Sequence, residues 1–166
     1  MSEKDYVIRD LVIEKKDAVV NMHDFYRMAQ KWFYDHGYEF LEKFYGEKLT
    51  DEAEFKKDAH LKWRSFKKID DYTKFQFKMD IIFQDFKKVK DKEDRYTYKG
   101  TVRLFINAYL QKDYEEIWEA NFLARFIREL YDKIVVSDKF MRYKREFSDE
   151  VYDFLGNAKA FLKMER

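Results

Sequence analysis

The chain of 166 residues contains no cysteine, no proline and only four glycines. Without cysteine it has no disulfide and no thiolate nucleophile, and it lacks the commonest ligand of structural zinc sites. The isolated glycines form no phosphate-binding loop, and no serine stands in a nucleophile-elbow motif. His23, His36 and His60 are too scattered to form a metal-binding pair. These absences predict no metal and no cofactor, and they favour a protein that is not an enzyme.

Long apolar runs and an excess of one charge are also missing. No stretch approaches the roughly 20 apolar residues of a membrane helix, and residues 1–5 lack the apolar run of a signal peptide. We therefore expect a cytoplasmic protein that does not enter a membrane. The net charge of +1 gives no global attraction to nucleic acid, so a polyanionic partner would need a local basic patch.

What the chain does have is aromatic and charged residues. Hydrophobic residues make up 46% of it, charged residues 40% and aromatic residues 20%. A chain of this length fits one domain. The composition predicts a single domain with a core of large flat rings and a densely charged exterior.

The clearest pattern lies between Tyr72 and Leu110. From Phe75 to Phe83 every second residue is Phe, Met or Ile, and the same period returns from Tyr96 to Leu110 beyond a polar connection. This alternation predicts a hairpin of two long strands. The phase changes after Phe83, which predicts a β-bulge, and Gly100 predicts either a bend or close packing of a large aromatic neighbour.

Shorter patterns predict the other strands and the first helix. Strands are expected at Tyr6–Glu14, Tyr38–Tyr45 and His60–Lys67, with Gly46–Asp58 as a loop or hairpin turn. A helix is expected to begin at Asn21 or Asp24 and to stop at His36 and Gly37.

Two more helices are expected after the hairpin. Asp113 and Glu116 form a capping-box pattern before apolar residues at helical spacing from Trp118 to Ile134. Phe140, Phe147, Phe154 and Phe161 then follow one another seven residues apart. One helix from Lys139 to Lys163 would align these rings as a stripe, whereas a new start at Ser148 would divide it. The stripe either covers the sheet or forms an interface with a second copy or another protein.

These elements together predict an α+β domain with an antiparallel sheet of four to five strands, covered by helices and closed by a long C-terminal helix. The order of elements resembles the helix-grip arrangement of lipid-binding and polyketide-cyclase-like domains. That resemblance implies a cavity beneath the last helix, lined by Phe, Tyr and Met side chains and able to hold an apolar ligand.

Several short segments carry a second resemblance. They are His36-Gly37-Tyr38, Trp63 with Lys67–Tyr72, Lys112–Tyr114 with Trp118, and Lys159–Leu162. They resemble segments of small uncharacterised archaeal proteins over most of the chain. The resemblance implies no activity and no functional residue.

Basic residues gather in two runs. The first, between Ala59 and Ile69, contains no acid and is interleaved with aromatic residues, and the second begins the C-terminal helix. Basic groups beside aromatic rings suit phosphate contact and base stacking, although they also suit a solvated strand face. If the runs share one surface, they predict a patch for RNA or an acidic protein, made of Lys62, Trp63, Arg64, Lys67, Lys68, Arg142, Lys144 and Arg145.

Three functions therefore stay open at the level of sequence. The first is a non-enzymatic interaction module that binds RNA or an acidic protein through the basic patch. The second is a carrier or enzyme for an apolar small molecule with a helix-grip-like cavity. The third is a homo-oligomeric structural protein that uses the Phe stripe.

Overall fold

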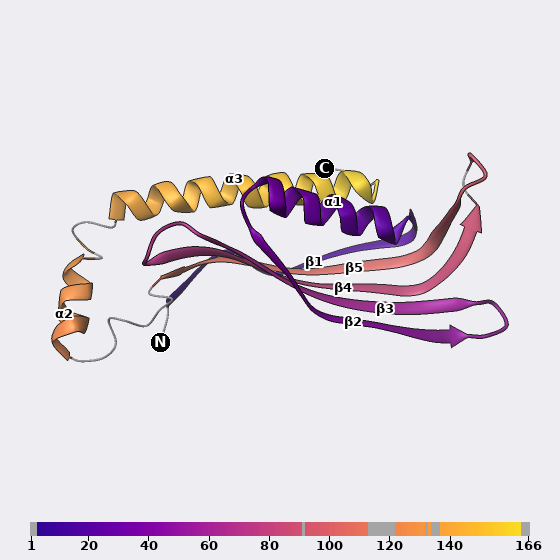
Figure 1. Cartoon of the computed structure of the whole chain (residues 1–166), viewed down its shortest axis with the longest axis horizontal. Coiled ribbons are helices and arrows are strands. Elements are labelled where there is room, and N and C mark those ends of the chain that lie inside the picture. Colours follow the sequence, from indigo (N-terminus) through magenta and orange to yellow (C-terminus); the bar gives the residue numbers. More distant parts are fainter. Residues whose placement is uncertain (1–2, 91, 113–121, 132, 134–136, 164–166) are drawn as a thin grey trace.

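The fold is one five-stranded antiparallel sheet with two of its helices on one face (Figure 1). The computed structural model describes residues 3–90, 92–112, 122–131, 133 and 137–163. The strands lie in the order β1-β5-β4-β3-β2, so β1 and β2 form the two edges. This arrangement confirms the predicted α+β class. In chain order the elements are β1 (Glu3–Val20), α1 (Met22–Asp35), β2 (Glu39–Asp51), β3 (Lys56–Lys68), β4 (Thr73–Lys90), β5 (Tyr96–Lys112), α2 (Phe122–Tyr131) and α3 (Ser137–Phe161).

The central hairpin of β4 and β5 follows the predicted alternation. Phe75, Phe77, Met79, Ile81 and Phe83 are buried on the side of the helices, while the residues that alternate with them are only partly buried on the other side. The register of β4 and β5 shifts between Gln84 and Lys87, which confirms the predicted β-bulge. The bulge moves Phe86 onto the buried face. One inserted residue makes every later side chain of the strand point to the opposite face.

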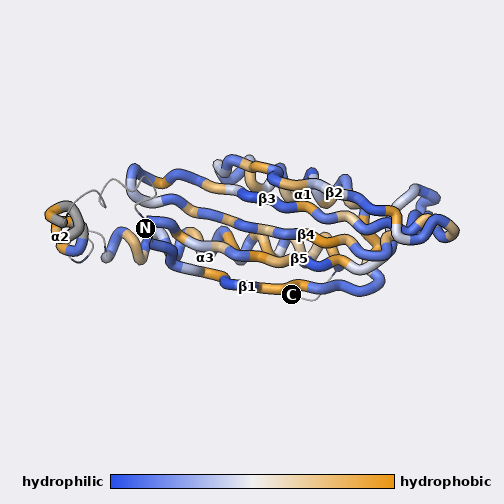
Figure 2. The backbone as a smooth tube through the Cα atoms, turned by 90° about the horizontal axis from the view of Figure 1, so that it is seen from below, coloured by the Kyte–Doolittle hydropathy of each residue, from blue (hydrophilic) through white to orange (hydrophobic). Residues whose placement is uncertain are grey.

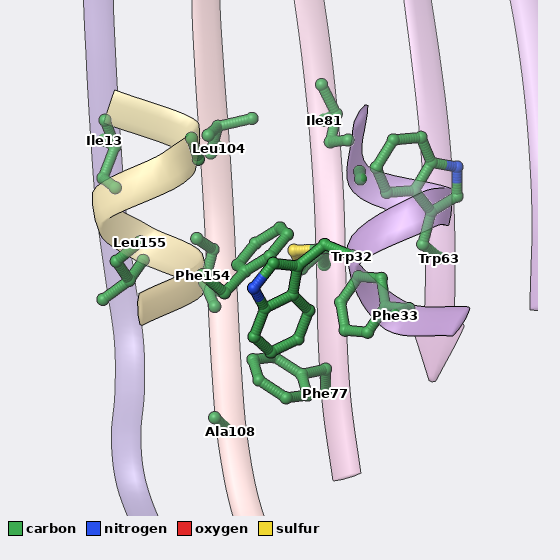
Figure 3. Packing of buried hydrophobic residues seen from close by; sticks show 14 of the residues in the cluster. Ile13, Trp32, Phe33, Trp63, Phe77, Ile81, Leu104, Ala108, Phe154 and Leu155 are labelled. Atoms are coloured by element: carbon green, nitrogen blue, oxygen red, sulfur yellow. The ribbon is translucent and has the colours of Figure 1, made fainter. Parts of the chain in front are cut away.

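The core is built from aromatic rings between the sheet and the two helices α1 and α3 (Figure 3). Phe154 of α3 lies 5.8 Å from Phe77 of β4 and 5.0 Å from Phe33 of α1, measured between ring centroids. Of the predicted stripe, Phe140, Phe147 and Phe154 are buried and Phe161 packs against the core. Since α3 is continuous from Ser137 to Phe161, the alternative break at Ser148 is wrong.

Capping residues predicted both ends of α1 correctly. The side-chain oxygen of Asn21 accepts hydrogen bonds from the backbone N–H groups of His23 and Asp24, which caps the first turn. The helix ends at Asp35, and Gly37 follows at φ 80°, a conformation that glycine adopts without strain.

Two strand predictions were too short. The first strand extends over Glu3–Val20, because bulges interrupt its alternation without ending its pairing with β5. The second runs to Asp51 and forms a hairpin with β3, where a loop was one of the two expectations. It is an edge strand with little burial on either side, so its sequence carries weak periodicity.

One segment of the second predicted helix, from Trp118 to Ile134, is described. The helix α2 falls inside it, with Leu123, Phe126, Ile127 and Leu130 exposed. The capping residues Asp113 and Glu116 lie outside the described residues, as does Trp118.

Both edge strands are irregular. The pairing of β1 with β5 shifts at three places, and Asp10 and Asp17 have φ values of 51° and 52°. The Asp10 backbone N–H donates to the side chain of Asn107 at 2.8 Å, which fastens one of these bends to β5. The pairing of β2 with β3 shifts between Glu42 and Phe44.

Replacing Gly100 by alanine is expected to lower the free energy of unfolding by about 2 kcal/mol, in the range of overpacked sites. A Cβ atom there would lie 2.6 Å from the Phe86 ring and 2.7 Å from the Gln84 carbonyl oxygen. Urea denaturation would measure the change. Gly156→Ala on α3 is the matched control, because nothing lies within 4 Å of its new Cβ, and it should stabilise the helix by up to about 1 kcal/mol. Equal stability of both variants would contradict the close packing of Phe86.

Candidate functional site

The two faces of the sheet differ in what covers them. The helices α1 and α3 pack on one face, which we call the helix face. Figure 2 looks onto the opposite face, which we call the open face. No described helix covers the open face. Because side chains alternate along a strand, neighbouring residues of one basic run go to different faces.

The first basic run is divided in this way. Lys62, Arg64 and Lys68 lie on the open face, opposite Asp80, Lys78 and Lys74 of β4. Trp63 and Lys67 lie on the helix face.

Trp63 and Lys67 are both engaged on the helix face. Trp63 is buried, and its indole N–H donates to a Glu42 carboxylate oxygen at 3.3 Å. The Lys67 ammonium donates to Glu150 of α3 at 2.5 Å. Neither residue is part of an accessible basic surface.

The second basic run does not join the first. Arg142, Lys144 and Arg145 belong to α3, on the other side of the sheet from Lys62 and Arg64. Lys144 also donates to the Asp5 carboxylate at 3.0 Å. The eight residues of the predicted patch therefore do not form one surface.

The open face instead joins basic and aromatic residues from four neighbouring strands. Lys68 stands directly opposite Lys74, and Arg64 directly opposite Lys78, with Phe66 opposite Gln76 between these two pairs. The next strand adds Tyr109 beside Gln76, and the edge strand adds Tyr6 beside Tyr109. We call this surface the basic-aromatic face and define it as Lys4, Tyr6, Arg64, Phe66, Lys68, Lys74, Lys78 and Tyr109.

Cations and rings interleave on the basic-aromatic face. The Lys74 ammonium lies 5.1 Å from the centroid of the Phe66 ring. The ammonium groups of Lys4 and Lys78 lie 5.2 and 5.5 Å from the centroid of Tyr109. Tyr6 packs against Tyr109 with a centroid distance of 5.1 Å. These distances are within the range of cation–π and aromatic contacts.

Cations lie directly opposite each other on the basic-aromatic face. Like charges directly opposite each other on neighbouring strands are destabilising. Burial, and then the charge of Lys68, lower the pKa of Lys74 below the ordinary value of a lysine. Acids offset part of this charge, since Asp80 accepts from Arg64 at 3.0 Å and the charge of Glu39 acts on Lys74. The five cations of the face, Lys4, Arg64, Lys68, Lys74 and Lys78, outnumber these two acids.

A polar cluster on the helix face fastens α3 to the sheet. The Tyr38 hydroxyl donates to one Glu150 oxygen at 2.5 Å, and Lys67 donates to the other. Burial, and then the hydrogen bond to Glu150, raise the pKa of Tyr38 well above its ordinary value. Nearby, the Trp32 indole N–H donates to Asp153 at 2.7 Å. These groups join α1, the connection after it, β3 and α3, which is the role of a structural clamp.

The space beneath the middle of α3 is filled. Phe147 stacks on Phe75 with centroids 4.5 Å apart, and Phe154 packs between Trp32 and Phe77. The large cavity that the helix-grip alternative places there is therefore occupied by the protein's own rings. The same packing buries Phe140, Phe147 and Phe154 of the Phe stripe and leaves Phe161 partly exposed.

Two hollows lie elsewhere on the helix side. An open groove of about 790 Å³ runs between β1 and α3, lined in part by Ile8, Leu11 and Leu155. A smaller, mainly apolar pocket of about 190 Å³ lies beside the start of α1.

Of the eight residues of the basic-aromatic face, the predicted patch contained only Arg64 and Lys68. Lys74, Lys78 and Tyr109 belong to the hairpin whose alternation was recognised, but only its apolar parity was used. The available signal was the set of polar residues that alternate with the apolar ones along adjacent strands. These residues become informative once the strand order is known, because the register decides which of them are neighbours.

Metal and membrane features were searched for in the part of the chain that the structure describes. No group of three or more His, Cys, Asp or Glu side chains there could hold a metal ion. No described helix is both long and apolar enough to cross a membrane.

The chain was compared with protein-family models, curated proteins and solved structures, and none of them matches it.

Proposed function

We propose that the protein binds single-stranded RNA on the basic-aromatic face. The observation that carries the proposal is the pairing of like charges, Lys68 with Lys74 and Arg64 with Lys78, around Phe66. Each pair brings two cations side by side on the sheet. A phosphate can lie between two such cations and release its counterions, so a chain of phosphates suits this arrangement.

The aromatic rings favour RNA over an acidic protein. Base stacking on an aromatic side chain is worth about 1–3 kcal/mol per base and tolerates any sequence. Phe66 and Tyr6 are the partly exposed rings of the face, whereas Tyr109 is buried under two lysines. A carboxylate-rich protein would use the cations alone and gain nothing from these rings.

The shape of the site fits a short strand of RNA. An uncovered antiparallel sheet that carries aromatic residues is a known way to hold two or three unstacked bases. Neighbouring strands lie about 4.8 Å apart. The face spans β1, β5, β4 and β3, so it offers three such spacings across the sheet.

The proposal predicts that reversing two of the facing charges weakens RNA binding. The double variant Lys68→Glu and Lys74→Glu should bind a fluorescein-labelled single-stranded RNA at least tenfold more weakly in anisotropy titrations. The slope of its log affinity against log salt concentration should also become shallower by roughly 1.4, since two phosphate contacts are lost and each contributes about 0.7 to the slope.

The matched control reverses two exposed lysines near the other end of the sheet, Lys48→Glu and Lys87→Glu. This control has the same net charge and should bind within a factor of three of the parent protein. Equal weakening of both double variants would contradict a specific site. Displacement of the RNA by poly-L-glutamate of equal charge, as effective as displacement by unlabelled RNA, would show an acidic-partner site and reject the RNA proposal.

A further inference from the structure

The pocket beside the start of α1 lies apart from the basic-aromatic face. It is on the helix face, where the first turns of α1 meet residues of β2, β3, β4 and β5. It measures about 190 Å³. Its lining consists of Met22, His23, Phe25, Tyr26, Tyr45, Ala59, Leu61, Trp63, Phe83 and Tyr98.

The wall of the pocket is a rigid set of rings. Phe25 stacks near Trp63 with centroids 6.3 Å apart, and Phe83 meets Phe25 edge to face at 6.5 Å. Tyr26 meets Trp63 edge to face at 5.1 Å. Phe25, Trp63 and Phe83 are buried. Rings that hold one another in this way cannot easily turn to fill the space themselves.

The rim of the pocket is polar. The Tyr45 hydroxyl donates to Glu47, and burial, followed by that hydrogen bond, raises the pKa of Tyr45 to about 12. A hydroxyl that stays protonated keeps an oxygen lone pair free to accept a hydrogen bond. Tyr98 and His23 add further polar atoms to the lining. The site thus combines an apolar body with hydrogen-bonding groups at its edge.

The size of the pocket selects among apolar ligands. A cavity of about 150 Å³ lined by apolar side chains is enough to bind benzene. A fatty acid or sterol would need several hundred Å³. We infer that this pocket binds a neutral molecule with one aromatic ring and a single hydroxyl or N–H group, held ring inward by Phe25, Trp63 and Phe83.

Phenol is the probe that tests this inference, and Met22 is the reporter. Met22 lines the pocket, whereas Met141 is exposed on α3. In spectra of protein labelled with ¹³C at the methionine methyl groups, phenol should shift the Met22 signal in a saturable way and leave Met141 unchanged. Cyclohexanol at equal concentration should shift Met22 less. A Met22 signal that does not move, or moves in proportion to phenol without saturation, would overturn the inference.

A filling substitution gives an independent test. Ala59→Leu places added methyl groups inside the pocket, so it should leave the midpoint of thermal unfolding within a few degrees and abolish the phenol shift. Ala108→Leu is the matched control, because Ala108 is fully buried in β5 and lines none of the hollows described above. It should be clearly destabilised. If Ala59→Leu is destabilised as much as Ala108→Leu, or fails to fold, the pocket is already filled in solution and the inference is wrong. RNA binding plays no part in either test, so this inference and the proposed function can fail separately.

Discussion

Replacing Phe154 by alanine is expected to lower the free energy of unfolding by about 4 kcal/mol, as for other buried phenylalanines. The side chain is 1% exposed. It is the point where α1, α3 and the sheet meet, since its ring contacts Trp32, Phe33 and Phe77. Its loss would leave a void bounded by three rings that hold one another in place, so the site collapses only partly.

Urea denaturation followed by far-ultraviolet circular dichroism would measure this change. Tyr152→Ala is the control, because Tyr152 lies on the same helix and is 62% exposed. That variant should stay within about 0.5 kcal/mol of the parent protein. A loss of under about 1 kcal/mol for Phe154→Ala would mean that α3 does not close the core.

Replacing Glu150 by alanine is expected to cost about 3 kcal/mol, at the low end for a broken buried ion pair. Both side chains of the Lys67–Glu150 pair are 16% exposed. The substitution leaves the Lys67 ammonium without its carboxylate and the Tyr38 hydroxyl without its acceptor. The cost arises from these two polar groups, which stay among apolar rings with nothing to bond to.

Two further variants distinguish the loss of the Lys67–Glu150 ion pair from a change in helix propensity. Asp149→Ala changes the exposed neighbour of Glu150 on α3 and should have little effect. The double variant Glu150→Ala with Lys67→Met should recover most of the lost stability, because the stranded charge is gone. If the double variant is as unstable as Glu150→Ala alone, the clamp is not the cause of the loss.

The sequence predicted best where one period was strong and long. The alternation from Phe75 to Phe83 and the seven-residue spacing from Phe140 to Phe161 each place large rings against a core, and both elements are found as expected. Asn21 and Gly37 marked the ends of α1 because capping depends on chemistry within a few residues.

The sequence predicted least where a strand lies at an edge. The strand β2 is partly exposed on both sides, so no alternation distinguishes it from a loop after Tyr45. The residues of the predicted patch are divided between two faces for a related reason. Residues adjacent in sequence, such as Lys67 and Lys68, lie on opposite faces of a strand, while Lys68 and Lys74 become neighbours only through the register of β3 and β4.

The bends in β1 affect whether the protein aggregates at high concentration. An edge strand with a regular row of unpaired N–H and C=O groups invites a strand from another molecule to add to it. At Asp10 and Asp17 the backbone of β1 turns into the left-handed region, so that row is broken twice. A second copy would find no long straight stretch along which to continue the ladder. The molecule can therefore leave one face of its sheet free of the described helices without offering that edge for growth into fibres.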